Sequence, residues 1–485
     1  MRGKDGVFPP CILAWRHYTN TVLLFPISVP KGSPSMEQAT VLRRRQPGIL
    51  SLTWPIFIEL LLQMLVGNAD QVMVGHFDHN GVGAIGNANQ ITNLVLLVFS
   101  VISTASTILI SRYLGAEDKR RVNETYTLSL LVNAIFGLAV GAILIALCGP
   151  IFTLMQVPAE ILERSCLYLR IIGGGMVFQA VYLTFTAFFR SNQMMKESMI
   201  VAVVMNLLNI GGNAVLIGGA FGLPALGVAG AALSSDISRV VGVILIAVLF
   251  RRKFGPVLSL KLLRPFPTDQ LRRLLRIGIP AGGESISYNL SQVAIQSICN
   301  LFAIFVINTR VYANMFAMLT YMFGSAISQA AQVMVAHLMG ADRVPDVERL
   351  VKRTLLASLA ISGLMAVVLL VFCQPLLSLF TQDPQVLELF RIIMIIEIPL
   401  ELGRAVNMVM CRALQACGDI RFPITICIFS AWLTAVVGGF LLAVPLGLGL
   451  AGLWIAMACD ECLRAVLFLL RWRSRAWCRK NVLSM

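Results

Sequence analysis

Charged residues are scarce in this chain, and the sequence motifs of common enzymes are missing from it. Asp, Glu, Lys and Arg make up 13% of the 485 residues, whereas hydrophobic residues make up 57%. Soluble domains average about 25% charged residues, so this balance excludes an ordinary soluble protein. A nucleophile elbow, a phosphate loop and an HExxH pattern are all lacking. We therefore expect no enzymatic activity and no metal site.

Basic residues are nearly absent from every second loop. The net charge of +15 would suit a nucleic-acid partner, but no patch combines basic with stacking aromatic residues, as such binding requires. Basic clusters instead occupy the alternate loops, as at 43–45, 119–121 and 251–253. This alternation follows the positive-inside rule. It indicates a multi-pass membrane protein with both termini in the cytoplasm and with anionic lipid headgroups as its surface partner.

Hydrophobic residues gather in twelve stretches, each long enough to cross a bilayer, which takes about 20 residues. The stretches lie at 48–75, 82–113, 122–149, 161–189, 197–219, 224–250, 273–302, 309–338, 350–373, 385–411, 422–444 and 447–471. The sequence therefore predicts an all-α membrane protein with twelve transmembrane helices, six in each half of the chain.

The two halves repeat the same landmarks. Three pairs of motifs lie 225 positions apart: Pro55-x-x-x-Glu59 with Pro280-x-x-x-Glu284, Gly115-Ala116-Glu117 with Gly340-Ala341-Asp342, and Cys148-Gly149-Pro150 with Cys373-Gln374-Pro375. Further on the offset is 222, which pairs Arg190-x-x-Gln193 with Arg412-x-x-Gln415. We predict two repeat-related six-helix lobes, 48–250 and 273–473. Transporters built from such repeats place their sites at the repeat interface.

Three segments fall outside the two lobes. Residues 251–272 form a basic linker and 474–485 a tail, both expected in the cytoplasm. Residues 1–47 form an N-terminal extension without a convincing signal peptide, because its apolar run is short and broken by Pro26 and Pro30. We expect residues 1–35 to be disordered, or translation to begin at Met36. An intact-mass measurement of the natively expressed protein distinguishes the two.

Polar side chains inside the helices carry the functional information, because a charge at bilayer depth costs about 2.5–3.5 kcal/mol and usually faces a bundle interior or a wet cavity. In the first helix Glu59, Gln63 and Asp70 share one face. The seventh helix has a stripe of polar residues four apart, namely Glu284, Tyr288, Gln292, Gln296 and Asn300. Such stripes must line protein or water rather than lipid.

Asp70 is the first candidate for ion coupling, because no basic residue lies within a helical turn of it. A carboxylate without such a partner can exchange a proton or hold a cation. In the fifth helix Asn209 and Asn213 lie one turn apart, and their amide oxygens can bind a hard cation or simply join helices by hydrogen bonds. The positions equivalent by repeat are apolar: Ile295, Ala431 and Ala435. The ion-coupling candidates therefore sit in the first lobe.

The later helices add further charges. The tenth carries Glu397, Glu401 and Arg404, and the sixth and twelfth carry Asp236-x-x-Arg239 and Glu461-x-x-Arg464, spaced to form ion pairs that tie helices together. For the substrate cavity we predict Glu59, Gln63, Glu284, Tyr288, Gln292, Glu401 and Arg404.

The chain resembles the multidrug and toxic compound extrusion (MATE) antiporters over residues 48–473. The matching motifs are Pro55-x-x-x-Glu59 leading to Ala69-Asp70-Gln71-Val72-Met73-Val74-Gly75, then Arg112-Tyr113-Leu114-Gly115-Ala116, and the segment from Arg412 to Gly418-Asp419. The resemblance implies a V-shaped pair of six-helix lobes that exports organic cations in exchange for Na⁺ or H⁺. It places Asp70 on the family's first-helix aspartate and Asn209 on its fifth-helix asparagine. Asn213 stands where some members have an aspartate.

Taken together, these features predict an inner-membrane secondary antiporter that exports amphipathic, cationic organic compounds by alternating access. It would be a monomer that needs no cofactor beyond its coupling ion, Na⁺ or H⁺. The alternative on the same repeat fold is a flippase for a lipid-linked precursor, which would line its cavity with arginines for phosphate. Carboxylates outnumber Arg404 among the cavity candidates, which favours cationic cargo.

Overall fold

The computed structural model describes residues 48–219, 222 and 224–479. The extension predicted for residues 1–47, including the possible start at Met36, lies outside the described residues, as do residues 480–485 of the predicted tail. Within the described part, all regular elements are helices, which confirms the predicted all-α class.

Each of the twelve predicted stretches has its helix, six in each half of the chain. The first half contains α2 (Ile49–Gly75), α3 (His79–Gly115), α4 (Lys119–Leu154), α5 (Ala159–Ser191), α6 (Met195–Leu216) and α7 (Gly227–Phe254). The second half contains α8 (Thr268–Cys299), α9 (Ile304–Gly340), α10 (Val344–Val371), α12 (Pro384–Cys417), the segment from α13 (Arg421–Ser430) through η4 (Ala431–Val437) to α14 (Gly438–Ala443), and α15 (Gly449–Arg473). Short helices η3 (Leu260–Leu263), α11 (Cys373–Leu377) and η5 (Ala476–Arg479) lie between or after them.

Two details differ from the sequence-based expectation. The eleventh stretch is not one continuous α-helix, because its middle seven residues, η4, form a π-helix between α13 and α14. The seventh helix, α8, begins at Thr268, inside the segment predicted as linker. Its first turns carry Asp269, Arg272 and Arg273. These charges place the first turns outside the apolar stretch, although the turns are helical.

The repeat extends to the backbone of the turns. Glu117 after α3 and Asp342 after α9 lie at equivalent positions, and both adopt the left-handed conformation, with φ of 57° and 55°. Positive φ is uncommon for residues other than glycine, so its recurrence supports a common origin of the two turns. In the first turn the Asp118 side chain then accepts a hydrogen bond from the Arg121 amide at 3.1 Å and caps α4.

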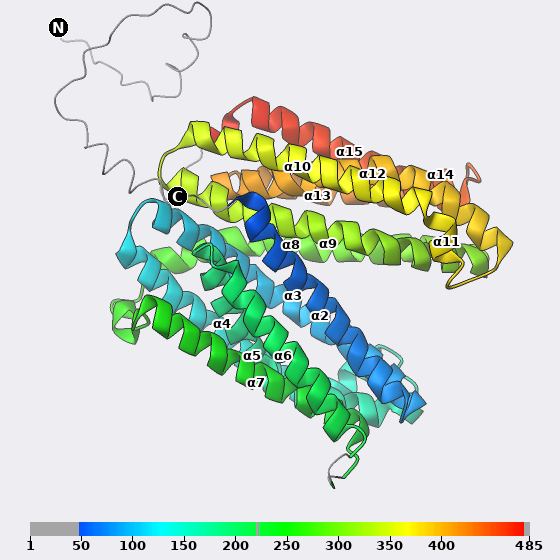
Figure 1. Ribbon diagram of the computed structural model, residues 1–485, viewed down its shortest axis with the longest axis horizontal. Helices are drawn as coiled ribbons and strands as arrows, with labels where there is room; N and C mark the ends of the chain where they lie inside the picture. Colours follow the sequence, from blue (N-terminus) through cyan, green and yellow to red (C-terminus); the bar gives the residue numbers. More distant parts are fainter. Residues whose placement is uncertain (1–47, 220–221, 223, 480–485) are drawn as a thin grey trace, which may run out of the picture. The chain divides into compact units, whose positions relative to one another are not determined.

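Helices of one half pack mainly against one another. In the first half α5 packs against α3, α4 and α7, and in the second half α12 packs against α9, α10 and α15. Figure 1 shows α4, α5, α6 and α7 running side by side. Two of the apolar cores follow this division, one around Phe152 and Tyr168 and another around Phe390 and Trp454, whereas other apolar clusters join residues of both halves. The two halves are therefore two helical bundles, as the repeat predicted.

The outer surfaces of these bundles suit lipid. Among the described residues, eight segments are long and apolar enough to cross a membrane: α2 to α7, α10 and the segment 421–443. Large apolar side chains such as Leu138 on α4 and Leu364 on α10 are 60% and 64% exposed. The long helices outside this set are α8, α9, α12 and α15, all in the second half. Two of them, α12 and α15, supply the buried network of charges described below, and α8 lines the pocket beside it.

The halves meet where α3 and α9 end. A Cβ on Gly115 would lie 2.0 Å from the carbonyl oxygen of His337, and a Cβ on Gly340 would lie 2.1 Å from that of Arg112. The contact is reciprocal, because Gly115 and Gly340 are repeat equivalents, as are Arg112 and His337. Two further bonds cross here: Arg112 Nε donates to Ala416 O at 3.1 Å, and His337 Nε2 lies 2.6 Å from Ser191 O. Only glycine allows so close an approach of two helix backbones.

Candidate functional site

Asp70 lies inside the first bundle and is held by polar side chains from two other helices. It is 4% exposed. Asn213 Nδ2 on α6 donates to its Oδ1 at 2.5 Å, and Ser235 Oγ on α7 donates to its Oδ2 at 3.1 Å. Asn209 Nδ2 donates in turn to Ser235 Oγ at 2.9 Å. The three residues predicted for ion coupling are thus brought together, two in direct contact and the third through a serine.

This group offers oxygen atoms to a positive charge. The side-chain oxygens of Asn209 and Asn213 are buried, and neither has a hydrogen-bond partner among the described residues. A buried carbonyl oxygen without a donor is costly, whereas carboxylate, amide and hydroxyl oxygens are the ligands that hard cations prefer. Within the described part of the chain, no Lys or Arg nitrogen lies within 4 Å of the Asp70 carboxylate. The arrangement can therefore accept a proton or a small hard cation.

The nearest guanidinium on α7 is engaged elsewhere. Arg239 Nη1 lies 2.9 Å from Asp236 Oδ1, so the predicted i,i+3 pair of this helix is formed. Gly175 on α5 makes room for that carboxylate, since a Cβ there would lie 2.0 Å from Asp236 Oδ1. Ser235, which bonds Asp70, directly precedes this pair in the sequence.

Glu59 is placed differently from Asp70, although both are on α2. It is 1% exposed and pairs with Arg190 on α5, with Nη2 and Oε1 2.9 Å apart. Arg190 Nη1 also donates to Gln329 Oε1 on α9 at 2.8 Å, so this ion pair is tied to the second half. Gln63, one turn along α2 from Glu59, is exposed. A role for Glu59 and Gln63 in the substrate cavity stays a prediction.

Glu284, the repeat equivalent of Glu59, has no such ion pair among the described residues. Its Oε2 accepts a bond from Gln415 Nε2 at 3.3 Å, and its Oε1 lies 4.0 Å from Cys411 Sγ. The side chain is half-buried. The same position of the repeat therefore carries a neutralised carboxylate in the first half and an uncompensated one in the second.

The second bundle contains a buried network of charges. Arg404 on α12 pairs with Glu401 and lies 3.8 Å from both Glu397 Oε1 and Glu461 Oε1. Arg464 on α15 pairs with Asp460 and lies 3.3 Å from Glu461 Oε1. Four carboxylates thus share two guanidinium groups. If all six groups are ionised, two negative charges are left over in a buried setting, which is costly without protons or a cation to balance them.

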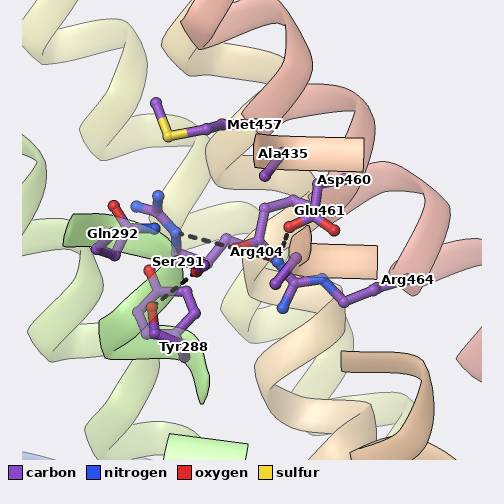
Figure 2. A pocket seen from close by; sticks show the side chains of 10 residues that line it. Tyr288, Ser291, Gln292, Arg404, Ala435, Met457, Asp460, Glu461 and Arg464 are labelled. Atoms are coloured by element: carbon purple, nitrogen blue, oxygen red, sulfur yellow. Dashed lines mark hydrogen bonds and ion pairs between the residues drawn. The ribbon is translucent and has the colours of Figure 1, made fainter. Parts of the chain in front are cut away.

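A small pocket opens beside this network. It is lined by Tyr288, Ser291 and Gln292 of α8 and by charged residues of α12 and α15 (Figure 2). It has room for about one water molecule, so an organic substrate does not fit into it in this conformation. The predicted cavity residues Tyr288, Gln292 and Arg404 meet here, and Glu401 is bonded to Arg404. Glu284, one turn before Tyr288, is not part of the lining.

The π-helix forms one wall of this pocket. Ala431 and Ala435, which line it, belong to η4. By the repeat they correspond to Asn209 and Asn213 of the first-half site. π-Helical turns are rare and often mark functional sites. The two halves thus use one position of the repeat in two ways, with amides in the first and a widened, apolar helix in the second.

Several residues of these sites were not among the predicted site residues. Ser235 donates a hydrogen bond to Asp70, and Asn407 donates one to Glu461. Both lie on helices that also carry the charged residues of a predicted ion pair. Asp460 directly precedes the predicted pair Glu461-x-x-Arg464 but was not itself predicted. The signal that could have identified Ser235 is Arg239, because residues four apart share a helix face.

Comparison with known proteins gives a consistent result. The MatE family model matches residues 55–215 and again 280–441, two spans that begin 225 positions apart. The chain is 36% identical to "Uncharacterized transporter YisQ" of Bacillus subtilis over 90% of this chain and 95% of that protein. It is 28% identical to "Probable multidrug resistance protein NorM" of Thermotoga maritima over 90% and 94% of the two chains. Among solved structures, that of a MATE in the bent conformation matches with a TM-score of 0.82 and 20% identity, covering 88% of this chain and 94% of the other.

Proposed function

The chain belongs to the MatE family of multidrug efflux transporters, and from this premise we propose that it is an antiporter which exports amphipathic organic cations in exchange for Na⁺ or H⁺. The observation that carries the proposal is the polar group around Asp70. Beside this buried carboxylate lie two amide oxygens that have no hydrogen-bond partner among the described residues, and the group can take up and release one proton or one small cation. This is what a coupling site must do.

Cationic cargo is supported by the charges of the second half. The network around Arg404 has two more carboxylates than guanidinium groups, and Glu284 has no ion pair among the described residues. A positive substrate would balance this excess charge. An anionic substrate, such as the phosphate of a lipid-linked precursor, would add to it. A flippase is therefore the less favoured alternative, and the relatives named as multidrug resistance proteins point the same way.

The contact between the two halves indicates how access to the substrate pathway alternates. The halves are joined where α3 and α9 end, next to the basic turn Lys119–Arg121. By the positive-inside rule this is the cytoplasmic end. The substrate pathway is then closed to the cytoplasm in this conformation, and loading from the cytoplasm requires the Gly115–Gly340 contact to open. The protein would work as a monomer in the inner membrane, with both termini in the cytoplasm.

The test is transport by purified protein in proteoliposomes. A cationic fluorescent dye is loaded, and a Na⁺ gradient and a pH gradient are imposed separately. We expect one of the two to drive dye movement against its concentration gradient, and a neutral analogue of the dye to move more slowly. Movement of lipid-linked phosphate without any ion-driven dye transport would instead favour the flippase.

A further inference from the structure

Three side chains from distant parts of the second half converge next to the substrate candidates. They are Glu284 on α8, Cys411 on α12 and Cys427 on α13. One ligand atom of each lies within 4.8 Å of the other two. Both cysteines are buried, and Glu284 is half-buried. The carboxylate is therefore the side from which an ion could enter.

The spacing is close to that of a metal centre. Zinc binds thiolates at about 2.3 Å and carboxylate oxygens at about 2.0–2.2 Å in a tetrahedral arrangement. Neighbouring ligand atoms around such an ion lie roughly 3.5–3.8 Å apart. The Glu284 Oε1 to Cys411 Sγ distance is already 4.0 Å. Side-chain rotations that move each ligand atom by less than about 1 Å would therefore place all three atoms at bonding distance from one ion.

The surroundings hold the ligands in place. Gln415 Nε2 donates to Glu284 Oε2 at 3.3 Å and to Cys411 Sγ at 3.4 Å, so one amide orients two of the three groups. Such outer partners are typical of metal sites. Arg464 Nη1 lies 4.0 Å from Cys427 Sγ, so the second thiol is also held by a polar neighbour.

We propose that Glu284, Cys411 and Cys427 bind a thiophilic divalent cation, such as Zn²⁺, with a fourth position left open. Binding displaces the two thiol protons to solvent, so one ion enters for two protons released. The proposal concerns equilibrium binding and does not depend on the transport function. Buried cysteines also serve as small packing residues, so the test must separate the two roles.

The chain provides a matched control for that test. Cys148 and Cys166 also lie next to each other, but Arg170 Nε donates to Cys148 Sγ at 3.0 Å in place of a carboxylate. Without a carboxylate beside them, these two thiols lack the third ligand of the proposed site and should not retain a divalent cation. A double variant Cys148→Ser/Cys166→Ser removes two thiols, one more than each single test variant, while leaving the proposed site intact.

The experiment is a titration of reduced, full-length protein in nanodiscs with Cd²⁺, followed by its thiolate charge-transfer absorption in the ultraviolet. We expect one ion per chain, displacement by Zn²⁺, and loss of the absorption in Cys411→Ser and Cys427→Ser. Glu284→Gln should weaken binding by about tenfold or more, and the Cys148→Ser/Cys166→Ser control should bind as the unaltered protein does. Absorption that persists in both single variants, or that vanishes in the control, would overturn the proposal.

A second measurement needs no variant and so does not depend on their folding. X-ray absorption at the zinc edge of the Zn²⁺-loaded protein should show two sulfur ligands at about 2.3 Å and oxygen near 2.0 Å. A shell of oxygen and nitrogen alone, or no bound zinc, would show that the three residues do not form the site.

Discussion

At the scale of single residues, the repeat-related pair Glu59 and Glu284 shows how one ancestral position acquired two environments. Glu59 faces Arg190 at 2.9 Å, whereas Glu284 faces the amide of Gln415 and the thiols of Cys411 and Cys427. The arginine equivalent to Arg190 by repeat is Arg412, and within the described part of the chain it makes no ion pair with Glu284. The same substitution at the two positions should therefore have different effects.

Glu284→Gln should weaken the export of cationic compounds while the protein stays folded. The substitution removes a charge with no ion-pair partner among the described residues, so the fold loses little. A cationic substrate loses an attraction on the order of 1.4 kcal/mol, which is about tenfold in apparent affinity. The measurement is dye efflux at several dye concentrations, with a neutral analogue as control. Equal losses for the neutral and cationic dyes would count against charge matching.

Glu59→Gln should instead reduce stability. It leaves Arg190 in a largely buried position without its counter-charge, and breaking a buried pair costs about 3–5 kcal/mol. Partial exposure of Arg190 places the expected loss at the lower end of that range. Thermal unfolding in detergent measures the effect. The double variant Glu59→Gln/Arg190→Gln should recover part of the loss, and a double variant less stable than Glu59→Gln alone would contradict this account.

At the scale of helices, most of the architecture could be predicted from the sequence, because the bilayer fixes how long an apolar stretch must be. All twelve stretches contain helices, and the turns after α3 and α9 repeat as their motifs do. The π-helix η4 could not be predicted, since Ala431 to Val437 are ordinary helix-compatible residues and the widened turn depends on what packs around them. The start of α8 was predictable only in part: the amphipathic pattern of Leu271 to Arg276 is compatible with a helix, but its charges leave open where the spanning helix begins.

The sites were predictable to different degrees for a related reason. Asp70, Asn209 and Asn213 stood out because their repeat equivalents are apolar, a contrast that is visible in one sequence. The partner of Glu59 was not foreseen, because the pairing of Glu59 with Arg190 depends on how α2 packs against α5. The cluster of Glu284 with Cys411 and Cys427 was also out of reach, since 127 residues separate the carboxylate from the first thiol.

The reciprocal glycine contact leads to a prediction for α3 and α9. In Gly115→Ala or Gly340→Ala the new methyl group would lie about 2 Å from a backbone oxygen of the opposite half, and a backbone cannot give way as a flexible side chain can. The joined end must therefore open, and the conformations with separated halves should gain population. We expect reduced efflux and a longer distance between spin labels placed on the turns after α3 and α9.

A glycine elsewhere in the bundles serves as the control. Gly174 on α5 has no atom within 4 Å of where a Cβ would be. Gly174→Ala should transport normally and keep the label distance unchanged. If Gly115→Ala behaves in the same way, the close approach of the two helices is not needed for the closed state.

At the scale of the whole molecule, the proposed ion site lies in the first half, whereas all the substrate candidates except Glu59 and Gln63 lie in the second half. The group around Asp70 belongs to α2, α6 and α7, whereas the pocket beside Arg404 belongs to α8, α12, η4 and α15. An ion bound in one half can influence a substrate in the other only by changing the energy of the joined and separated states. Coupling is thus a property of the whole chain, and it should be separable from substrate binding by substitution.

Asp70→Asn makes that separation, because asparagine has nearly the shape of aspartate but carries no charge to exchange. Asn213 and Ser235 still find an oxygen to bond, so the variant should fold. We expect the rate of dye transport driven by an ion gradient to fall by about tenfold or more, while the variant still binds the dye. The matched control is Asp78→Asn, whose carboxylate pairs with Arg164 beyond the end of α2 and should be dispensable for coupling. Ion-driven transport by Asp70→Asn at the unaltered rate would move the coupling site to the second half, where Glu284 and Glu401 are the carboxylates to test next.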